Sequence, residues 1–212
     1  ERIEILEGSS ARVFGSSAFN GAINIVTKRE KHTGARLSAE GGSCGTWGGN
    51  GRVSLATGAV TNSVSGGYRQ SDGGTLHSDF KRRQMFYQGD LASQHIDLQW
   101  QVGLSSQDFG ANTVYSAKFN DQFEATRRYL TSLSGTIKPF DTDWLTLVPQ
   151  LYWHRDYDHY QLIRGKEGAA AGENYHRTDV YGGGMTANLH RLLGTTSVGA
   201  DIRREHIVST AY

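Results

Sequence analysis

Apolar and polar residues alternate most clearly between residues 96 and 104. Ile96, Leu98, Trp100, Val102 and Leu104 are separated by polar or small residues. In an extended strand, alternate residues share a face, so this segment has one apolar and one polar face. In a soluble sandwich the apolar face would enter a core, whereas in a membrane barrel it would face lipid. This segment alone leaves both interpretations open.

Segments of similar character recur along most of the chain and predict an all-β fold. Strands are expected near residues 34–42, 50–58, 62–71, 80–93, 95–107, 126–138, 144–156, 176–190 and 195–208. Several of them are much longer than the five or six residues usual in soluble proteins. About nine long strands favour part of an antiparallel transmembrane β-barrel, in which tilted strands extend beyond the lipid.

The predicted connections alternate between short and long. Counting strands puts every short connection on one side of the sheet and both long ones on the other, as in bacterial outer-membrane barrels. The short connections are residues 58–61, 93–95, 139–143 and 191–194, and the long ones are residues 108–125 and 157–175.

Before the first of these strands, the opening residues predict a compact unit of their own. Ile3 and Ile5 alternate with charged residues in a short strand, which Gly8 ends. Residues 11–14 fit one helical turn, and Ala22–Val26 favours a second strand because it is rich in β-branched residues.

The order of residues in this unit resembles the end of the plug domain of TonB-dependent outer-membrane receptors. The matching positions also include Ser10, Phe14 and Ala18, whereas Ser9 stands where proline is usual in the family. The structural motif residues that carry the resemblance are Glu1, Arg2, Ile3, Glu4, Gly8, Gly15, Gly21, Ile23, Asn24 and Ile25. The resemblance implies a plug segment at residues 1–28, a linker at 29–33 and the N-terminal portion of an outer-membrane barrel at 34–212.

By this resemblance the chain is a fragment of a transporter in the outer membrane of a Gram-negative bacterium. The whole protein would take up a scarce, bulky nutrient such as a ferric siderophore or cobalamin, without catalysis and without a cofactor. Its partners would be outer-membrane lipid, the TonB complex through an N-terminal part that is missing here, and, as a further candidate, a surface lipoprotein.

Composition narrows the alternatives. A formal net charge of +1 argues against a dedicated nucleic-acid binder, and the single cysteine, Cys44, excludes an intrachain disulfide. The chain has 27 glycines and only 2 prolines, which suits many strands joined by turns. No run of 18 apolar residues exists, so a membrane-spanning helix is excluded, but a β-barrel is not.

The densest polar cluster lies around residues 153–160. His154, Asp156 and Asp158 would share one face of an extended strand and His159 the other. These side chains could bind a divalent metal or activate water in an outer-membrane hydrolase. The competing interpretation, which we prefer, is that residues 154–156 finish a strand and the others begin an exposed loop. A soluble β-sheet adhesion module is a third hypothesis for the chain.

The first long loop carries a mixture of aromatic and polar residues suited to a large polar ligand. Binding residues are often mounted on loops that a rigid scaffold holds. The ligand-loop candidates are Phe109, Asn112, Tyr115, Lys118, Phe119 and Phe123. The alternative is a loop that only packs over the barrel mouth.

Three further expectations concern the wall itself. Aromatic residues near strand ends are candidates for interfacial girdles, and Pro149 implies a bulge or an edge strand. Four charged residues would face the lumen or the plug: Arg36, Glu40, Arg52 and Arg69. The girdle candidates are Tyr68, Phe86, Tyr87, Tyr129, Trp144, Tyr152, Trp153 and Tyr181.

Overall fold

The computed structural model describes residues 2–7, 21–26, 29, 32–141, 144–192 and 194–210. The chain divides into a first unit, residues 1–31, and a second unit, residues 32–212. In the first unit, β1 (Arg2–Glu7) pairs antiparallel with β2 (Gly21–Val26). The two expected strands are therefore confirmed, whereas Glu1, Gly8, Gly15 and the helical turn at 11–14 lie outside the described residues.

Gly21 shows why this pairing needs a glycine. A Cβ at this position would lie 2.6 Å from the backbone carbonyl oxygen of Leu6 on β1. A side chain would have to push the two strands apart, so any other residue would weaken the start of the ladder.

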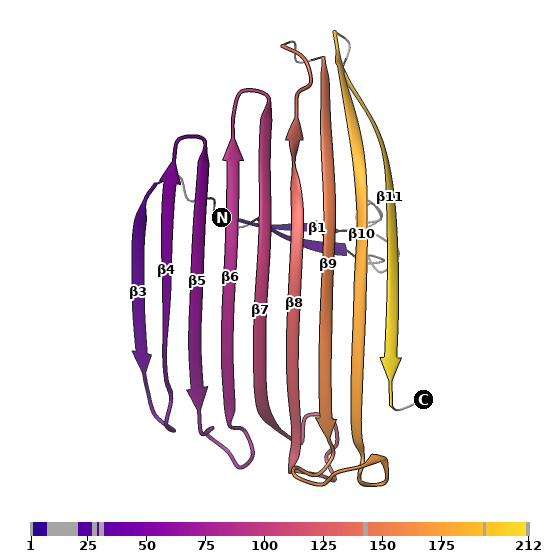
Figure 1. Ribbon diagram of the computed structural model, residues 1–212. Coiled ribbons are helices and arrows are strands. Elements are labelled where there is room, and N and C mark those ends of the chain that lie inside the picture. Colours follow the sequence, from indigo (N-terminus) through magenta and orange to yellow (C-terminus); the bar gives the residue numbers. More distant parts are fainter. Residues whose placement is uncertain are drawn as a thin grey trace. The chain divides into compact units, whose positions relative to one another are not determined.

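The second unit is one antiparallel sheet of nine strands in chain order (Figure 1). This confirms the all-β expectation, and each strand lies near its expected position. Among the described residues, no helix has the length and apolar character needed to cross a membrane. The strands are β3 (Gly34–Gly41), β4 (Trp47–Thr57), β5 (Val60–Ser71), β6 (Phe80–Ala92), β7 (Ile96–Asn112), β8 (Gln122–Ile137), β9 (Leu145–Gln161), β10 (Glu173–Arg191) and β11 (Gly194–Ser209).

The sheet has two ends, which we call the turn end and the loop end. The connections β4–β5 (residues 58–59), β6–β7 (residues 93–95), β8–β9 and β10–β11 form the turn end, at the top of Figure 1. The connections 42–46, 72–79, 113–121 and 162–172 form the loop end, at the bottom. All expected short connections thus share one end, and both expected long loops lie at the other.

The strands reach further toward the loop end than the sequence predicts. The expected loops 108–125 and 157–175 shorten to residues 113–121 and 162–172, because β7, β8, β9 and β10 continue into them. The continuous ladder between β9 and β10 pairs Gln161 with Glu173 at its last step. Backbone pairing therefore persists after the regular alternation of apolar and polar side chains has ended.

Cross-strand register gives the sheet one apolar and one polar face. Directly paired residues share a face, so the assignment made on β7 extends to every strand through the observed pairings. The apolar face carries Leu37, Val53, Val64, Met85, Val102, Leu133, Leu151, Met185 and Ile202, one from each strand. The polar face carries their neighbours Ser38, Ser54, Ser65, Gln84, Gln101, Ser132, Gln150, Thr186 and Asp201.

The apolar face has no second layer packed on it in the described part of the chain. Leu37 is 84% exposed and Ile202 is 77% exposed. Among the described residues, the buried hydrophobic side chains are Ala111 and Val180 alone. A continuous exposed apolar surface of this kind marks contact with lipid or with another protein, and a soluble sandwich would have covered it.

The loop-end limit of the apolar surface runs diagonally across the strands. Leu104 on β7 is still apolar, but Arg155 and Asp179 lie in the same register row on β9 and β10. On β11 the last apolar residue before the charged positions is Ile202, further toward the turn end. Strands that cross a horizontal membrane boundary at a tilt give this pattern, because register rows run perpendicular to the strands.

Two expectations about single residues of the wall are corrected. Pro149 lies in β9, which is an interior strand of the sheet. The pairing register between β8 and β9 is the same before and after Pro149, so this residue marks neither an edge strand nor a bulge. The ladder to β8 is simply interrupted there, because proline has no N–H to donate. Phe86 and Tyr152 lie on the polar face by register and therefore do not belong to a lipid-facing girdle. The candidates on the apolar face are Tyr68, Tyr87, Tyr129, Trp153 and Tyr181.

Candidate functional site

The polar face at the loop end brings together charged and aromatic residues from three strands. Phe109, Glu124 and Tyr160 occupy one register row on β7, β8 and β9. Two rows toward the turn end, Arg128 forms an ion pair with Asp156, with 2.9 Å between Nε and Oδ1. This surface combines aromatic rings with both signs of charge, which is the chemistry needed to hold a large polar ligand.

Tyr115 extends this surface from the loop 113–121. Its hydroxyl donates a hydrogen bond to the Glu124 carboxylate, and its ring meets that of Tyr160 edge to face at 5.5 Å. The hydrogen bond to the carboxylate raises the pKa of Tyr115 to about 12, with burial as the second cause. Tyr115 is therefore a neutral hydrogen-bond donor at physiological pH, already oriented by the sheet.

The six ligand-loop candidates do not form one cluster. Tyr115, Lys118 and Phe119 lie in the loop 113–121, but Phe109 and Asn112 belong to β7 and Phe123 to β8, which corrects their assignment to a loop. Phe109 lies on the polar face. Phe123 lies on the opposite face by register, where the Arg164 guanidinium covers its ring at 4.7 Å from the centroid.

Gln122 holds the loop 113–121 in place, and sequence reasoning missed it. It is fully buried, and its Nε2 lies 2.8, 3.0 and 2.7 Å from the carbonyl oxygens of Asn112, Ser116 and Phe119. Its two N–H groups must share these three acceptors. The Tyr160 hydroxyl donates to Gln122 Oε1 at 2.7 Å. One side chain thus fixes both ends and the middle of the loop.

Arg164 joins the loop 162–172 to the turn 72–79. Its guanidinium donates two hydrogen bonds to Asp79, at 2.7 and 3.0 Å, and its backbone N–H donates to the Asp121 carbonyl at 2.7 Å. The hydrogen bond from Arg164 lowers the pKa of Asp79. His77 Nδ1 lies 2.9 Å from Asp121, so three loop-end connections are tied together. We call this group the loop clasp: His77, Asp79, Asp121 and Arg164.

The histidine and aspartate cluster has a different setting from the one expected. His154, Asp156, Asp158 and His159 all lie within β9, so no loop begins after Asp156. As expected, the first three share the polar face and His159 lies on the other, where it contacts Glu173 at 2.8 Å. Within the described part of the chain, no group of three or more His, Cys, Asp or Glu side chains is arranged to hold a metal ion.

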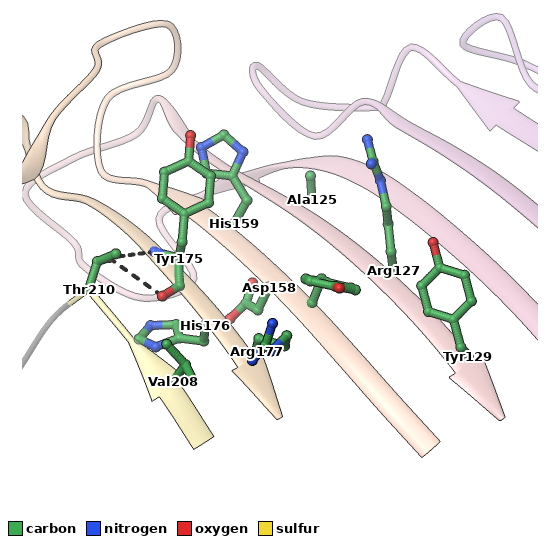
Figure 2. Close-up of a pocket in the computed structure, with 11 residues that line it drawn as sticks. Ala125, Arg127, Tyr129, Asp158, His159, Tyr175, His176, Arg177, Val208 and Thr210 are labelled. Atoms are coloured by element: carbon green, nitrogen blue, oxygen red, sulfur yellow. Dashed lines mark hydrogen bonds between the residues drawn. The ribbon is translucent and has the colours of Figure 1, made fainter. Parts of the chain in front are cut away.

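A cavity of about 610 Å³ lies at the loop end of β8, β9, β10 and β11 (Figure 2). Most of its lining residues share the apolar face by register, among them Arg127, Tyr157, Tyr175 and Arg177. Figure 2 shows Tyr175 beside His159, and their rings stack at 4.2 Å. This cavity therefore opens on the opposite side of the sheet from Arg128 and Asp156.

The four charged residues expected on the polar face all occur there by register. Glu40 pairs with Arg69 at 2.6 Å within the wall, and both line a small polar cavity of about 190 Å³ together with Arg82. Arg52 donates to the Ser63 hydroxyl at 3.1 Å. Glu40 and Arg69 therefore pair with each other within the sheet.

Comparisons with known proteins give a result at the level of structure alone. No family model matches the sequence, and a comparison with curated proteins finds no match. Among solved structures, the siderophore receptor PiuA from Acinetobacter baumannii is similar over 98% of this chain and 35% of its own, with 12% identity and a TM-score of 0.78.

Two further structures agree. The siderophore receptor PirA from Pseudomonas aeruginosa is 18% identical over 99% of this chain and 36% of its own, with a TM-score of 0.71. The copper transporter OprC is 15% identical over 98% of this chain and 33% of its own, with a TM-score of 0.75. The chain thus spans about a third of the length of these structures. It has the fold of that third of a β-barrel receptor, which agrees with the resemblance drawn from its opening residues.

Proposed function

We propose that this chain is part of a TonB-dependent outer-membrane receptor that imports a bulky metal-containing nutrient, with a ferric siderophore as the first candidate. The observation that carries the proposal is the two-faced sheet. An apolar face without a second layer among the described residues suits contact with lipid, and a polar face lined with paired charges suits an aqueous lumen. The fold shared with siderophore receptors and a copper transporter supports the same function.

In this proposal the loop end faces the outside and the turn end faces the periplasm. Bacterial outer-membrane barrels have short periplasmic turns and longer outer loops. Residues 1–28 would then be the end of the plug, and residues 29–33 would lead into the wall. The remainder of the plug and the TonB-contacting part would belong to the rest of the protein.

The ligand would meet the polar face at the loop end. Tyr115 offers a hydroxyl and a ring, and Arg128 and Asp156 offer charge two register rows further into the lumen. No covalent step is needed, because uptake requires only that ligand binding biases the conformation of loops and plug, which is a coupling between two sites. The proposed activity is therefore transport and not catalysis.

Uptake by cells that express the full-length protein tests this proposal. Cells starved of iron and lacking their own receptors would be given a panel of radiolabelled ferric siderophores, cobalamin and copper. We expect uptake of one ferric siderophore that disappears in cells without TonB. Equal uptake with and without TonB would contradict the proposal, and TonB-dependent uptake of copper or cobalamin alone would replace the siderophore with that ligand.

Variants of the polar face locate the site. Arg128→Ala combined with Tyr115→Ala should raise the concentration for half-maximal uptake at least tenfold, because it removes a charge and a ring that face the ligand. Ser197→Ala, on the polar face of β11 away from this surface, serves as the control and should leave uptake unchanged. Similar uptake by both variants would move the ligand site elsewhere in the protein.

A further inference from the structure

Two arginines lie on the apolar face where it changes from apolar to charged. Arg83 is on β6 and Arg127 is on β8, and Ser106 on β7 is paired with both. Two positions toward the turn end on the same face, Met85 pairs with Leu104. The two cationic side chains therefore stand directly at the loop-end border of an apolar surface.

A shallow cavity of about 420 Å³ joins these residues. Its lining residues on the apolar face are Arg83, Arg127, Ser106, Met85, Leu104 and Tyr129, and the cavity also touches Gln84, Ser105 and Arg128, whose positions belong to the polar face. Met85 is 52% exposed and Leu104 is 42% exposed, and both arginines are exposed as well. The cavity thus has an apolar part and a cationic part in the order in which a membrane passes from acyl chains to headgroups.

The charge of this cavity is positive. The Arg83 guanidinium lies 5.8 Å from the centroid of the Tyr68 ring, and neither arginine forms an ion pair with the residues that the structure describes. The acidic residue one row further toward the loop end, Asp108, is paired in register with Lys81. Three cationic side chains therefore face one carboxylate on this part of the apolar face.

We propose that Arg83 and Arg127 bind the phosphate of a lipid headgroup in the outer leaflet, while an acyl chain of that lipid lies against Met85 and Leu104. Guanidinium groups bind phosphate through two parallel hydrogen bonds, which a single ammonium group cannot provide. Ser106, between them, supplies a hydroxyl donor. This inference rests on the proposed function, because it needs the apolar face to contact lipid and the loop end to lie outside.

The apolar part of the cavity selects a lipid over a free anion. Inorganic phosphate would contact Arg83 and Arg127 but gain nothing from Met85 and Leu104, whereas a lipid gains from both. The second cavity, on β8 to β11, shares Arg127 and Tyr129 with this one. A large phosphorylated headgroup has room to extend from one cavity to the other over the outside of the wall.

Lipid binding by the full-length protein in detergent tests the proposal. Native mass spectrometry would follow binding of diphosphoryl lipid A and of monophosphoryl lipid A as the probes. We expect Arg83→Gln combined with Arg127→Gln to weaken binding of the diphosphoryl form about thirtyfold, since each cationic residue at an anionic lipid surface contributes a factor of about five. The control is Arg36→Gln combined with Arg82→Gln, which removes two exposed arginines of the opposite face that lie outside this cavity and should change binding less than twofold.

Each outcome decides the question. Equal weakening in the two double variants would overturn the proposal, because only one pair faces lipid in it. Full displacement of the lipid by inorganic phosphate at equal concentration would also overturn it and would assign the site to a free anion. Failure of the proposed transport would be seen separately, as loss of TonB-dependent uptake, in cells whose receptor still binds lipid A.

Discussion

The turn end and the loop end of the sheet are stabilised by different interactions. At the turn end, the strands carry an apolar face and are joined by connections as short as residues 58–59. At the loop end, the apolar face is gone, and buried polar groups such as Gln122 and ion pairs such as Arg164 with Asp79 hold the strands and loops. In the proposed receptor, lipid would stabilise the first region, whereas hydrogen bonds between side chains and loops order the second.

The largest effect should come from a charge placed on the apolar face near the turn end. Leu151→Arg would put a guanidinium into lipid, and we expect it to lower the free energy of unfolding by about 2–4 kcal/mol. Urea unfolding of the full-length protein from liposomes measures this. Gln150→Arg is the matched control, because its side chain lies on the polar face near Asp201, at 3.3 Å from Gln150 Nε2. Equal losses in both variants would refute the assignment of the faces.

Replacing the buried amide of the loop end should have the next largest effect. Gln122→Leu leaves three carbonyl oxygens and the Tyr160 hydroxyl without their partner, at a cost of about 1–3 kcal/mol. We expect faster hydrogen exchange in residues 113–121 with little change in the turn-end strands. Gln107→Leu, the same chemical change on the open polar face of β7, is the control. Unchanged exchange in the loop would show that Gln122 does not order it.

The ion pair between Arg164 and Asp79 in the loop clasp should contribute less to stability, because both side chains are about one-third exposed. A double-mutant cycle of Asp79→Asn and Arg164→Gln should give a coupling of at most about 1 kcal/mol. The readout is the rate of backbone hydrogen exchange in residues 162–172 and 72–79. This rate should rise in each single variant to the same extent as in the double variant. Additive effects would show that the two side chains act independently.

The pH dependence of this pair has a defined sign. Arg164 lowers the pKa of Asp79 from its ordinary value of 3.8. The ion pair therefore stabilises the folded loops fully when the pH is above the pKa that Asp79 has in the unfolded chain. This stabilisation is lost as the pH falls through the lowered pKa. We expect the loops to stay ordered from neutral pH into mild acid and to open only in stronger acid.

The smallest effect on stability should come from Tyr115→Phe. Tyr115 is 55% exposed, so loss of its hydroxyl should change the free energy of unfolding by no more than about 0.5 kcal/mol. Its titration is the sharper test, because the raised pKa of about 12 requires the bond to Glu124. Ultraviolet absorbance should lose one late-titrating tyrosine in Tyr115→Phe and show it titrating earlier in Glu124→Gln.

The turn-end half of the fold could be predicted from the sequence because a sheet with one apolar and one polar face requires strict alternation along its strands. The alternation is unbroken at Ile96, Leu98, Trp100, Val102 and Leu104. The short connections then determine the antiparallel order of the strands. The strand extensions could not be predicted in this way. Neither Asp108–Asn112 nor Tyr157–Gln161 alternates between apolar and polar residues, so the pattern resembles a loop although the backbone ladder continues.

The candidate site was predicted less well, for a related reason. Tyr115 could be named because aromatic residues in a long loop suit a ligand, but the contacts that orient it are not local. Gln122 is a single amide with no distinctive neighbours, and Arg164 meets Asp79 across 85 residues of sequence. Such contacts depend on which strand ends become neighbours, and the register of the sheet determines that.

Cysteine accessibility along β7 in the full-length protein tests the central claim most directly. Single cysteines at residues 97–104, in a background where Cys44 and any other native cysteine are serine, would be probed in membranes with a water-soluble maleimide and a lipid-confined one. We predict that Leu98, Val102 and Leu104 positions react with the lipid-confined reagent, and that Gln99 and Gln101 positions react with the water-soluble one. Loss of this alternation, or its reversal, would contradict the assignment of the sheet as a membrane barrel wall with its polar face toward the lumen.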